Sequence, residues 1–195
     1  MTHPSGRPPE LSEKDLVHRA VAGEAESFAA LYDRYAERIF RFLRRRTPDQ
    51  ALAEDLTSEV FLRAWDHLDS YRPSRAPFGA WLFRIARNLA IDHSRKRGPD
   101  ASIETLAPEP AERTPGPELE AAASLESRRL QEALAELTQS QQEVLSLRFI
   151  EGLSTAEVAA ALGKKAGAVR ALQMRGLQAL GEILRTDDGV DDDQP

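Results

Sequence analysis

The sequence contains no cysteine, and this absence excludes disulfide bonds, thiol nucleophiles and thiolate metal sites together. Histidine is also scarce, and the few histidines show no spacing typical of metal ligands: His3, His18, His67 and His93. No nucleophile–base pair or phosphate-binding loop is evident. We therefore expect no catalytic residues, no metal site and no cofactor, and we expect that the chain is not an enzyme.

Long apolar runs are missing as well. No stretch approaches the roughly 18 consecutive apolar residues of a transmembrane helix. The N-terminal sequence MTHPSGRPPE lacks the apolar core of a signal peptide. Because 41% of the residues are apolar and 30% are charged, a globular chain is expected. Together these features predict a soluble cytoplasmic protein with no membrane insertion.

Net charge is negative, at −6, which by itself argues weakly against a nucleic-acid partner. The charge is, however, unevenly distributed. Residues 84–97 hold five basic residues and one aspartate, RRR occupies 44–46, and acidic residues gather in 99–120 and in DDGVDDD at the C-terminal end. Exposed charges more than about 10 Å apart are largely screened at ~0.1 M salt. Local patches, not the total charge, therefore indicate which partners can bind.

Glycine and proline are sparse before residue 98 and then cluster, with few large apolar residues among them. This composition is typical of a linker, and a segment of this length spans at most roughly 70 Å. No useful β-alternation is present, so we expect an all-α chain of two small helical domains joined by a flexible linker. The expected divisions are an N-terminal segment with the first helix (1–23), a first module (24–97), a flexible proline-rich linker (98–117), a second module (118–184) and an acidic disordered tail (185–195).

Apolar residues at helical spacing predict the individual helices. In the first module we expect helices over 12–22, 24–46 and 50–68 and a fourth starting at Pro77. In the second we expect 118–137, 139–151, 154–162 and 166–184. The apolar residues at helical spacing in the first module are Phe28, Leu31, Tyr32, Tyr35, Ile39, Phe40, Leu43, Leu52, Leu56, Val60, Leu62, Trp65, Phe78, Trp81, Leu82, Ile85 and Leu89.

Residues 154–177, STAEVAAALGKKAGAVRALQMRGL, have the pattern of a helix-turn-helix unit. Ser154 and Glu157 form a capping box, Ala159 is small where two helices cross, and Gly163 tolerates the positive φ of a tight turn. Val169 is then an apolar residue that would pack the second helix against the first. In this interpretation Lys164, Lys165, Arg170 and Gln173 lie near DNA. Few side chains on this helix can read bases, so the unit alone should bind weakly.

Other interpretations of these segments stay open. The helix-turn-helix segment is also compatible with a plain helical hairpin inside a bundle, and each lysine with a solvated surface role. The polar side of helix 50–68 fits either a solvated face or a docking surface for another protein's helix. In FGAWLFRIARNLAIDHSRKR, the aromatic residues suit a core, whereas the basic face also suits unstacked bases and phosphates.

These segments resemble a known family, the extracytoplasmic-function (ECF) class of bacterial RNA polymerase sigma factors. FAALYDRYAERIFRFLRRR, AEDLTSEVFLRAW and FGAWLFRIARNLAIDHSRKR resemble its region two. LTQSQQEVLSLRFIEGLSTAEVAAALGKKAGAVRALQMRGLQAL resembles its region four. The similarity covers about residues 24–97 and 124–184, in the order and with the linker that the family has.

The resemblance implies a role for each segment. Helix 50–68 would dock on the β′ clamp helices of the RNA polymerase core, and the fourth helix with the loop before it would capture minus-ten promoter DNA. The implied core-docking residues are Glu54, Asp55, Ser58, Glu59 and Arg63. The implied minus-ten residues are Tyr71, Arg72, Arg75, Arg84, Arg87, Asn88, Asp92, Arg95, Lys96 and Arg97.

In the second module, the resemblance implies that the helix-turn-helix reads the minus-thirty-five element while neighbouring helices hold the β flap. The implied DNA-binding residues are Ser154, Thr155, Lys164, Lys165, Ala168, Arg170, Gln173, Met174 and Arg175. The resemblance also implies an anti-sigma factor that masks these faces.

This sequence departs from the usual family pattern at a few positions. Ser58 stands where glutamine is common, and Trp81–Leu82 stands where housekeeping members carry a tryptophan pair for melting DNA. Ala168, Ala171 and Leu172 replace residues that are often polar, which leaves the bases read by this helix undetermined.

The sequence thus predicts a promoter-specificity subunit that directs core polymerase to promoters, DNA melting and transcription initiation. One alternative is a stand-alone helix-turn-helix repressor or activator whose first module senses a ligand or dimerises. A second is an adaptor whose two modules both bind proteins.

Overall fold

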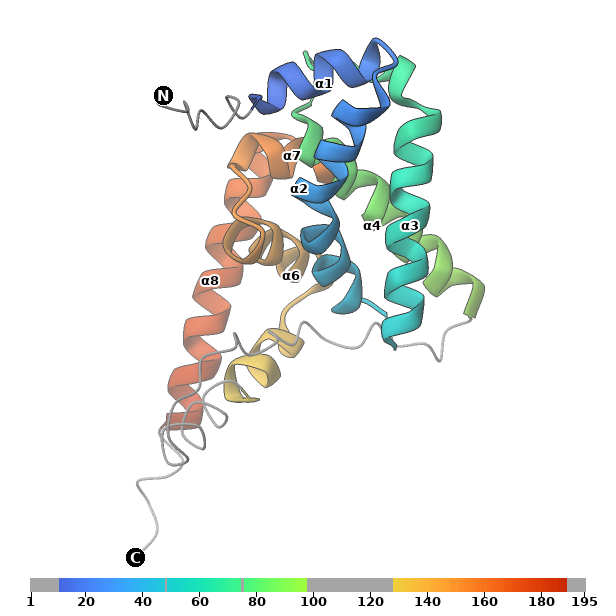
Figure 1. Ribbon diagram of the computed structural model, residues 1–195. Helices are drawn as coiled ribbons and strands as arrows, with labels where there is room; N and C mark the ends of the chain where they lie inside the picture. The colour runs from blue at the N-terminus through green and yellow to red at the C-terminus, as the bar shows by residue number, and fades with distance from the viewer. Residues whose placement is uncertain (1–10, 48, 75, 98–127, 189–195) are drawn as a thin grey trace, which may run out of the picture.

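The computed structural model describes residues 11–47, 49–74, 76–97 and 128–188, and all regular structure within these ranges is helical (Figure 1). The all-α prediction is therefore confirmed. The expected linker 98–117, Pro48 and Arg75 lie outside the described residues. None of the helices in the described ranges is long and apolar enough to cross a membrane.

Within residues 11–97, the described residues form four α-helices and one short 3₁₀ turn, of which α1 precedes the first module. α2 packs against α1, α3 and α4, and α3 also packs against α4. Figure 1 shows α1 lying across one end of α2, while α2 and α3 run side by side. The elements are α1 (Glu13–Val21), α2 (Ala25–Arg44), α3 (Gln50–Asp66), η1 (Leu68–Ser70) and α4 (Phe78–Arg97).

The second module is built around one long helix, α8, against which α6 and α7 pack. Residues 128–136 are helical before α6. The remaining elements are α6 (Gln139–Leu145), η2 (Ser146–Ile150), α7 (Thr155–Leu162) and α8 (Ala166–Asp188). In this arrangement α7 also packs against α4, so the two modules touch.

Local side-chain chemistry sets where the helices begin and end. The Asp15 N–H donates to the Ser12 hydroxyl at 3.2 Å, and the Leu52 N–H donates to Asp49 Oδ1 at 2.8 Å. These bonds satisfy N–H groups that the first turn of a helix leaves without a partner. α7 ends at Gly163, whose φ of 63° lies in the left-handed region that glycine adopts without steric cost.

Two predicted helix boundaries were wrong. The helix expected over 139–151 is α-helical only to Leu145 and continues as the π-helical turn η2. α8 continues to Asp188, four residues past the expected end at 184. Its last turns bond internally, because Arg185 Nε donates to the Gly181 carbonyl at 2.8 Å and the Thr186 hydroxyl donates to the Glu182 carbonyl at 2.9 Å. The expected tail from 185 therefore begins inside a helix.

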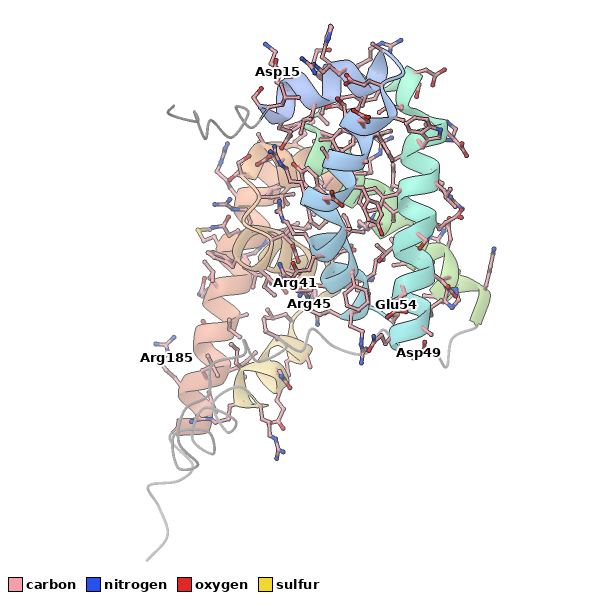
Figure 2. The ribbon with its side chains drawn as sticks, in the orientation of Figure 1. Asp15, Arg41, Arg45, Asp49, Glu54 and Arg185 are labelled. Atoms are coloured by element: carbon pink, nitrogen blue, oxygen red, sulfur yellow. The ribbon has the colours of Figure 1, made fainter. Side chains whose placement is uncertain are left out.

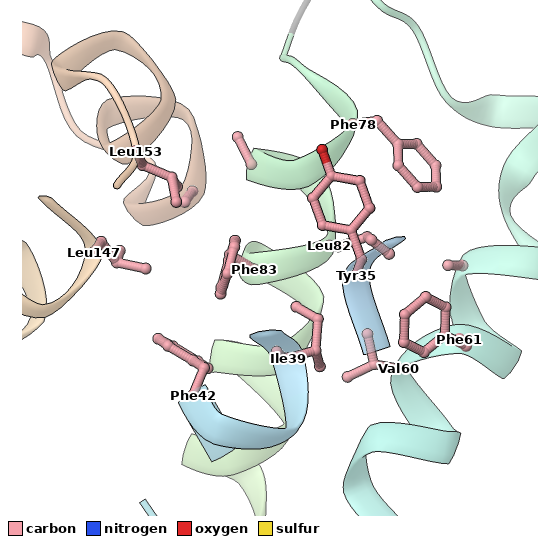
Figure 3. Packing of buried hydrophobic residues seen from close by; sticks show 14 of the residues in the cluster. Tyr35, Ile39, Phe42, Val60, Phe61, Phe78, Leu82, Phe83, Leu147 and Leu153 are labelled. Atoms are coloured by element: carbon pink, nitrogen blue, oxygen red, sulfur yellow. The ribbon is translucent and has the colours of Figure 1, made fainter. Parts of the chain in front are cut away.

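The core of the first module is rich in aromatic side chains. Phe42 contacts Phe83 edge to face with ring centroids 5.2 Å apart, and Phe78 contacts Tyr35 at 5.9 Å. Such edge-to-face pairs stabilise a core beyond the burial of their area. A Cβ at Gly79 would lie 2.9 Å from the Tyr35 ring, so the ring can pack in this place because the residue in α4 has no side chain. Figure 3 shows Phe78 on the side of Phe61, and Phe42 and Phe83 on the side of Leu147 and Leu153.

Three residues of the apolar patterns that predicted these helices lie at the surface. Leu62 is 59% exposed, Trp65 43% and Tyr32 42%. The inner face of α3 is formed instead by small and branched residues at helical spacing, among them Ala53, Val60 and Ala64. Because α3 carries apolar residues on more than one side, its apolar stripe did not identify the buried face.

The buried residues of the second module fall into two groups. One is a small separate cluster of Leu134, Leu137 and Leu145, with Leu180 and Ile183 of α8 packed against it. The other is continuous with the core of the first module and includes Leu147, Leu153 and Val158. Figure 3 shows Leu147 and Leu153 on the far side of Phe83 and Phe42 from α3.

Candidate core-docking and nucleic-acid surfaces

The exposed side of α3 combines acidic and apolar side chains. Asp55, Ser58, Leu62 and Trp65 are exposed and fall at the spacing of one helix face. Glu54, labelled in Figure 2, is also exposed. Its carboxylate accepts a hydrogen bond from Gln50 Nε2 at 2.7 Å. Arg63 Nε donates to Glu59 Oε1 at 2.7 Å. This arrangement presents an acidic edge beside an apolar patch.

Aromatic contacts hold the apolar part of this face in place. Trp65 packs edge to face on Phe28 with centroids 4.9 Å apart, and Tyr32 lies 4.6 Å from Phe61. These contacts orient rings that remain accessible to solvent, as expected of anchors in a protein interface. The sequence placed Leu62 and Trp65 only among the apolar residues at helical spacing that predicted this helix. Leu62 and Trp65 share a helix face with Asp55 and Ser58, and this common spacing could have grouped the four residues from the sequence.

The outer face of α4 is basic. Arg84, Asn88 and Arg95 are exposed at intervals that place them along one side of the helix, and Asp92 and Lys96 are exposed nearby. Arg87 differs, because it is only partly exposed and forms a bidentate ion pair with Glu143 of α6, at 2.9 and 3.1 Å. The side chain of Arg97 lies outside the described residues.

The loop before α4 is organised by Tyr71, which is buried rather than presented at the surface. Its hydroxyl donates to the Ala76 carbonyl at 2.8 Å, and its ring lies 4.9 Å from that of Trp81. Burial, and then the charge of Glu13, raises the pKa of Tyr71 to about 12, so its phenol stays protonated. In this arrangement Tyr71 supports the loop instead of offering a ring to a base.

A groove of about 800 Å³ lies between this loop and α1. Its walls mix apolar and charged side chains, including Val17, His18 and Phe78. Arg72, which is exposed, also lines it, and its guanidinium donates to the Asp69 carbonyl at 2.7 Å. Arg75 lies outside the described residues.

The helix-turn-helix geometry expected for residues 154–177 is present. The Ser154 N–H donates to Glu157 Oε2 at 2.7 Å and the Glu157 N–H donates to the Ser154 hydroxyl at 3.2 Å, so the predicted capping box is confirmed. Val158 and Val169 are completely buried between α7 and α8. The two short helices are therefore fixed relative to one another by a cap, a glycine turn and a small apolar core.

The N-terminal half of α8 is accessible. Lys165, Ala168, Arg170 and Arg175 are exposed, and Met174 is 66% exposed. Gln173 is partly buried, and its amide oxygen accepts a bond from Arg148 Nε at 3.2 Å. Before α8, Ser154 is exposed and Thr155 and Lys164 are partly exposed. Most of the residues predicted to contact the minus-thirty-five element are therefore at least partly exposed to solvent, and all lie on the second module.

No group of three or more histidine or acidic side chains in the described ranges is arranged to hold a metal ion. The described residues instead form charged and apolar surfaces that are suited to binding macromolecules. They are the acidic and apolar face of α3, the basic face of α4 and a helix-turn-helix with an accessible second helix.

Comparison with known proteins identifies both modules. The model of Sigma-70 region 2 matches residues 31–99, and that of Sigma-70, region 4 matches residues 127–180. The ECF RNA polymerase sigma factor SigL of Mycobacterium tuberculosis is 37% identical over 176 residues, which are 85% of this chain and 97% of SigL. The ECF RNA polymerase sigma factor BldN of Streptomyces coelicolor is 43% identical over 89% of this chain, which spans 66% of the length of BldN.

A solved structure gives the same result for the fold. The sigma factor RpoE of Bartonella quintana, solved in complex with the anti-sigma factor NepR, aligns with a TM-score of 0.64 at 26% identity. The alignment covers 83% of this chain and 99% of RpoE. The chain belongs to the ECF RNA polymerase sigma factors. It is a promoter-specific initiation factor of RNA polymerase, and a stand-alone repressor or activator is not favoured.

Proposed function

We propose that the two modules divide promoter recognition between them, with the first module docking on core polymerase and binding minus-ten DNA and the second reading the minus-thirty-five element. The proposed divisions are those of the sequence, 24–97 and 118–184, joined through 98–117. The observation that carries the proposal is that one module presents two distinct faces, on α3 and α4, while the helix-turn-helix lies on the other. Joining weak binders raises the effective concentration of each for its site.

The core-docking surface is the exposed face of α3. Glu54, Asp55, Ser58, Glu59 and Arg63 form its polar part, as the family resemblance implies. Leu62 and Trp65 extend it, because exposed apolar side chains beside charges are typical of the centre of an interface. The partner is a helical segment of the polymerase core, the β′ clamp helices.

Minus-ten DNA is bound by α4 and the loop before it. Arg84, Arg95 and Lys96 supply positive charge for phosphates, and Asn88 supplies a hydrogen-bonding amide. Tyr71 acts indirectly, by holding the loop that carries Arg72 and Arg75. Bases of single-stranded DNA also stack on aromatic rings. In α4 the partly buried Trp81 is the ring on which a base would stack.

The minus-thirty-five element is read by the first turns of α8. Arg170 is the residue best suited to bidentate contact with a guanine edge, whereas Lys164 and Lys165 suit phosphates. Ala168 and Met174 supply apolar contact. The exposed Phe149 and Leu177 of the same module offer an apolar surface for the β flap.

We infer an anti-sigma partner for this chain, supported by its similarity to RpoE, which was solved with NepR. We also infer that the chain acts in the cytoplasm, where the polymerase works, and that it has no catalytic activity of its own, since bond formation belongs to the core enzyme.

A pair of substitutions tests the division of labour. Arg170→Ala should reduce discrimination for the minus-thirty-five element by about 1–3 kcal/mol while leaving core affinity unchanged. Asp55→Ala should lower core affinity by roughly 1–2 kcal/mol and leave DNA discrimination by the assembled holoenzyme unchanged. Core affinity is measured by fluorescence titration with purified core, and discrimination by competition between promoter fragments.

Matched controls are available for both variants. Asp33→Ala removes an exposed aspartate from α2, and Arg185→Ala removes an exposed arginine from the far end of α8. Neither control should alter either measurement. If Arg170→Ala and Asp55→Ala weaken core binding equally, the assignment of α8 to DNA is wrong.

A further inference from the structure

The outer face of α8 is apolar in its first two turns. Gly167, Ala171 and Met174 follow one another at intervals of four and three residues, which places them along one side of the helix. Val169 and Gly176, which are buried, lie on the opposite side. Met174, at 66%, is the most exposed large apolar residue of the described ranges. We call Gly167, Ala171 and Met174 the apolar strip.

Two exposed arginines flank the apolar strip. Arg170 lies on one side of it and Arg175 on the other, because each residue of an α-helix is turned by about 100° from the one before. Arginine binds phosphates and guanine edges. The centre of a protein interface, in contrast, is typically formed by large side chains. A strip of one methionine and two very small residues between two arginines therefore fits the major groove of DNA better than it fits another protein.

The glutamine of this part of α8 is engaged within the protein. The Gln173 amide oxygen accepts a hydrogen bond from Arg148 Nε at 3.2 Å. Because arginine can only donate, the oxygen of the amide must face Arg148. Glutamine reads adenine by using its amide oxygen and nitrogen together. While Gln173 is bound to Arg148 it cannot make this contact, so base reading at this face is left to the apolar strip and the two arginines.

Nothing in the described part of the chain requires a glycine at position 167. Its φ is not positive, and a Cβ added there would meet no atom within 4 Å. Glycine is also a poorer helix former than alanine. A glycine inside a helix that its own protein does not explain often has a functional reason. The missing side chain leaves space on the outer side of α8, which the edge of a base can fill.

We propose that the apolar strip reads the C5-methyl groups of thymines in the minus-thirty-five element, while Arg170 and Arg175 fix its register on guanine and phosphate. This inference rests on the proposed function, which assigns the first turns of α8 to that element. Thymine alone carries a methyl group in the major groove, and apolar contact recognises it. From Gly167 to Met174 the helix rises roughly 10 Å at ~1.5 Å per residue, which is about three base-pair steps of ~3.4 Å. The element therefore contains adjacent A·T pairs beside a G·C pair.

Promoter fragments selected by the reconstituted holoenzyme provide the first test. They should carry at least two adjacent A·T pairs in the minus-thirty-five element. Replacing the thymines of these pairs by deoxyuridine removes only the methyl groups. Because each buried methyl contributes about fourfold to affinity, holoenzyme binding should weaken roughly tenfold, measured by fluorescence anisotropy. The same number of deoxyuridines between the two promoter elements should cost less than about twofold. Selected elements without adjacent A·T pairs, or equal costs at both places, would overturn the proposal.

Met174→Ala assigns the effect of the methyl groups to the apolar strip. In the holoenzyme with this variant, deoxyuridine should cost less than about threefold, because the methyl groups have lost their main partner. Val21→Ala removes an exposed apolar side chain from α1 and should keep the full cost. An unchanged cost in Met174→Ala contradicts the proposal. A loss of core affinity as large as the loss of promoter affinity contradicts it too, because Met174 would then contact the polymerase.

Gly167→Ala tests the space on the outer side of α8. The added methyl group should lower affinity for the selected fragments at least about fivefold, because it occupies the place of a base edge. The midpoint of thermal unfolding should stay the same or rise. Gly181→Ala adds a methyl group to the same helix, again with nothing within 4 Å, and should change promoter affinity by less than about twofold. Unchanged promoter affinity in Gly167→Ala would show that α8 does not approach the bases closely there, and the proposal would be wrong.

Arg170→Ala separates a failure of this proposal from a failure of the proposed function. If Arg170→Ala lowers minus-thirty-five discrimination while deoxyuridine and Met174→Ala change nothing, the proposed function stands and the reading of methyl groups is wrong. If Arg170→Ala changes nothing either, the assignment of α8 to this element is wrong as well.

Discussion

The two modules differ in how they are stabilised. The first has a core of large aromatic and aliphatic side chains contributed by four helices, including the completely buried Leu31, Ile39 and Leu82. The second divides its buried residues between a small leucine cluster and an extension of the core of the first module. The helix-turn-helix therefore draws part of its burial from α4.

This difference shows how a module with a small core of its own can be stabilised by its neighbour. A small module with little core of its own gains stability by docking on a larger one, because burial of apolar area is favourable wherever it occurs.

The largest expected effect lies in the first module. Phe78→Ala should destabilise the chain by about 3–5 kcal/mol, because Phe78 is buried among Tyr35, Tyr71 and Trp81 and its removal leaves a cavity. Urea unfolding followed by circular dichroism measures this loss. Phe149→Ala, at an exposed position, should change stability by less than ~0.5 kcal/mol. Equal losses in the two proteins would mean that the aromatic core is not what stabilises the first module.

A smaller effect is expected at the turn of the helix-turn-helix. Gly163→Ala should cost about 1–2 kcal/mol, because φ is positive at this residue although space is available for a methyl group. Gly181→Ala, in α8, also meets nothing within 4 Å and has no such φ, so it should stabilise the chain by up to ~1 kcal/mol. Thermal unfolding distinguishes the opposite signs. A stabilising Gly163→Ala would contradict the described turn.

The cap of α7 is expected to contribute about 1 kcal/mol. Ser154→Ala removes the hydroxyl that accepts the Glu157 N–H, which leaves that donor without its partner. Glu157→Gln preserves an acceptor at the third helical position and should lose less than half as much. Denaturant midpoints of the two variants provide the comparison, and a larger loss for Glu157→Gln would argue against the capping box.

The smallest effect on stability is expected at the docking face. Arg63→Ala breaks an exposed pair with Glu59 and should change the free energy of unfolding by less than about 0.5 kcal/mol. Its core affinity should nevertheless fall, since Arg63 lies on the proposed docking surface. Unfolding and core titration are measured on the same preparation. A stability loss above 1 kcal/mol with unchanged core affinity would give Arg63 a structural role only.

Local features of the fold could be predicted because they depend on near neighbours in sequence. The capping box at Ser154, the turn at Gly163 and the cap at Ser12 are each set by residues within one helical turn. The face of α3 that turns inward was not predictable in the same way. Leu62 and Trp65 are as apolar as Leu56 and Val60, and only packing against α2 and α4 selects which pair is buried.

The candidate site shows the same limit. The basic face of α4 followed from helical spacing, because exposed residues on one helix need no tertiary information. The burial of Tyr71 and the pairing of Arg87 with Glu143 depend on contacts between residues distant in the chain. Glu143 and Glu151 were missed for this reason, since an acidic residue on a predicted helix is ordinarily solvated.

The most direct test of the account is run-off transcription with purified core polymerase. Promoter fragments are first selected by the reconstituted holoenzyme and then used as templates, with and without this chain. The account predicts a transcript with a defined start that requires both core and this chain, and that is reduced by Arg170→Ala and by Asp55→Ala. Tight operator binding by the chain alone, with no core-dependent transcript from any selected fragment, would contradict it.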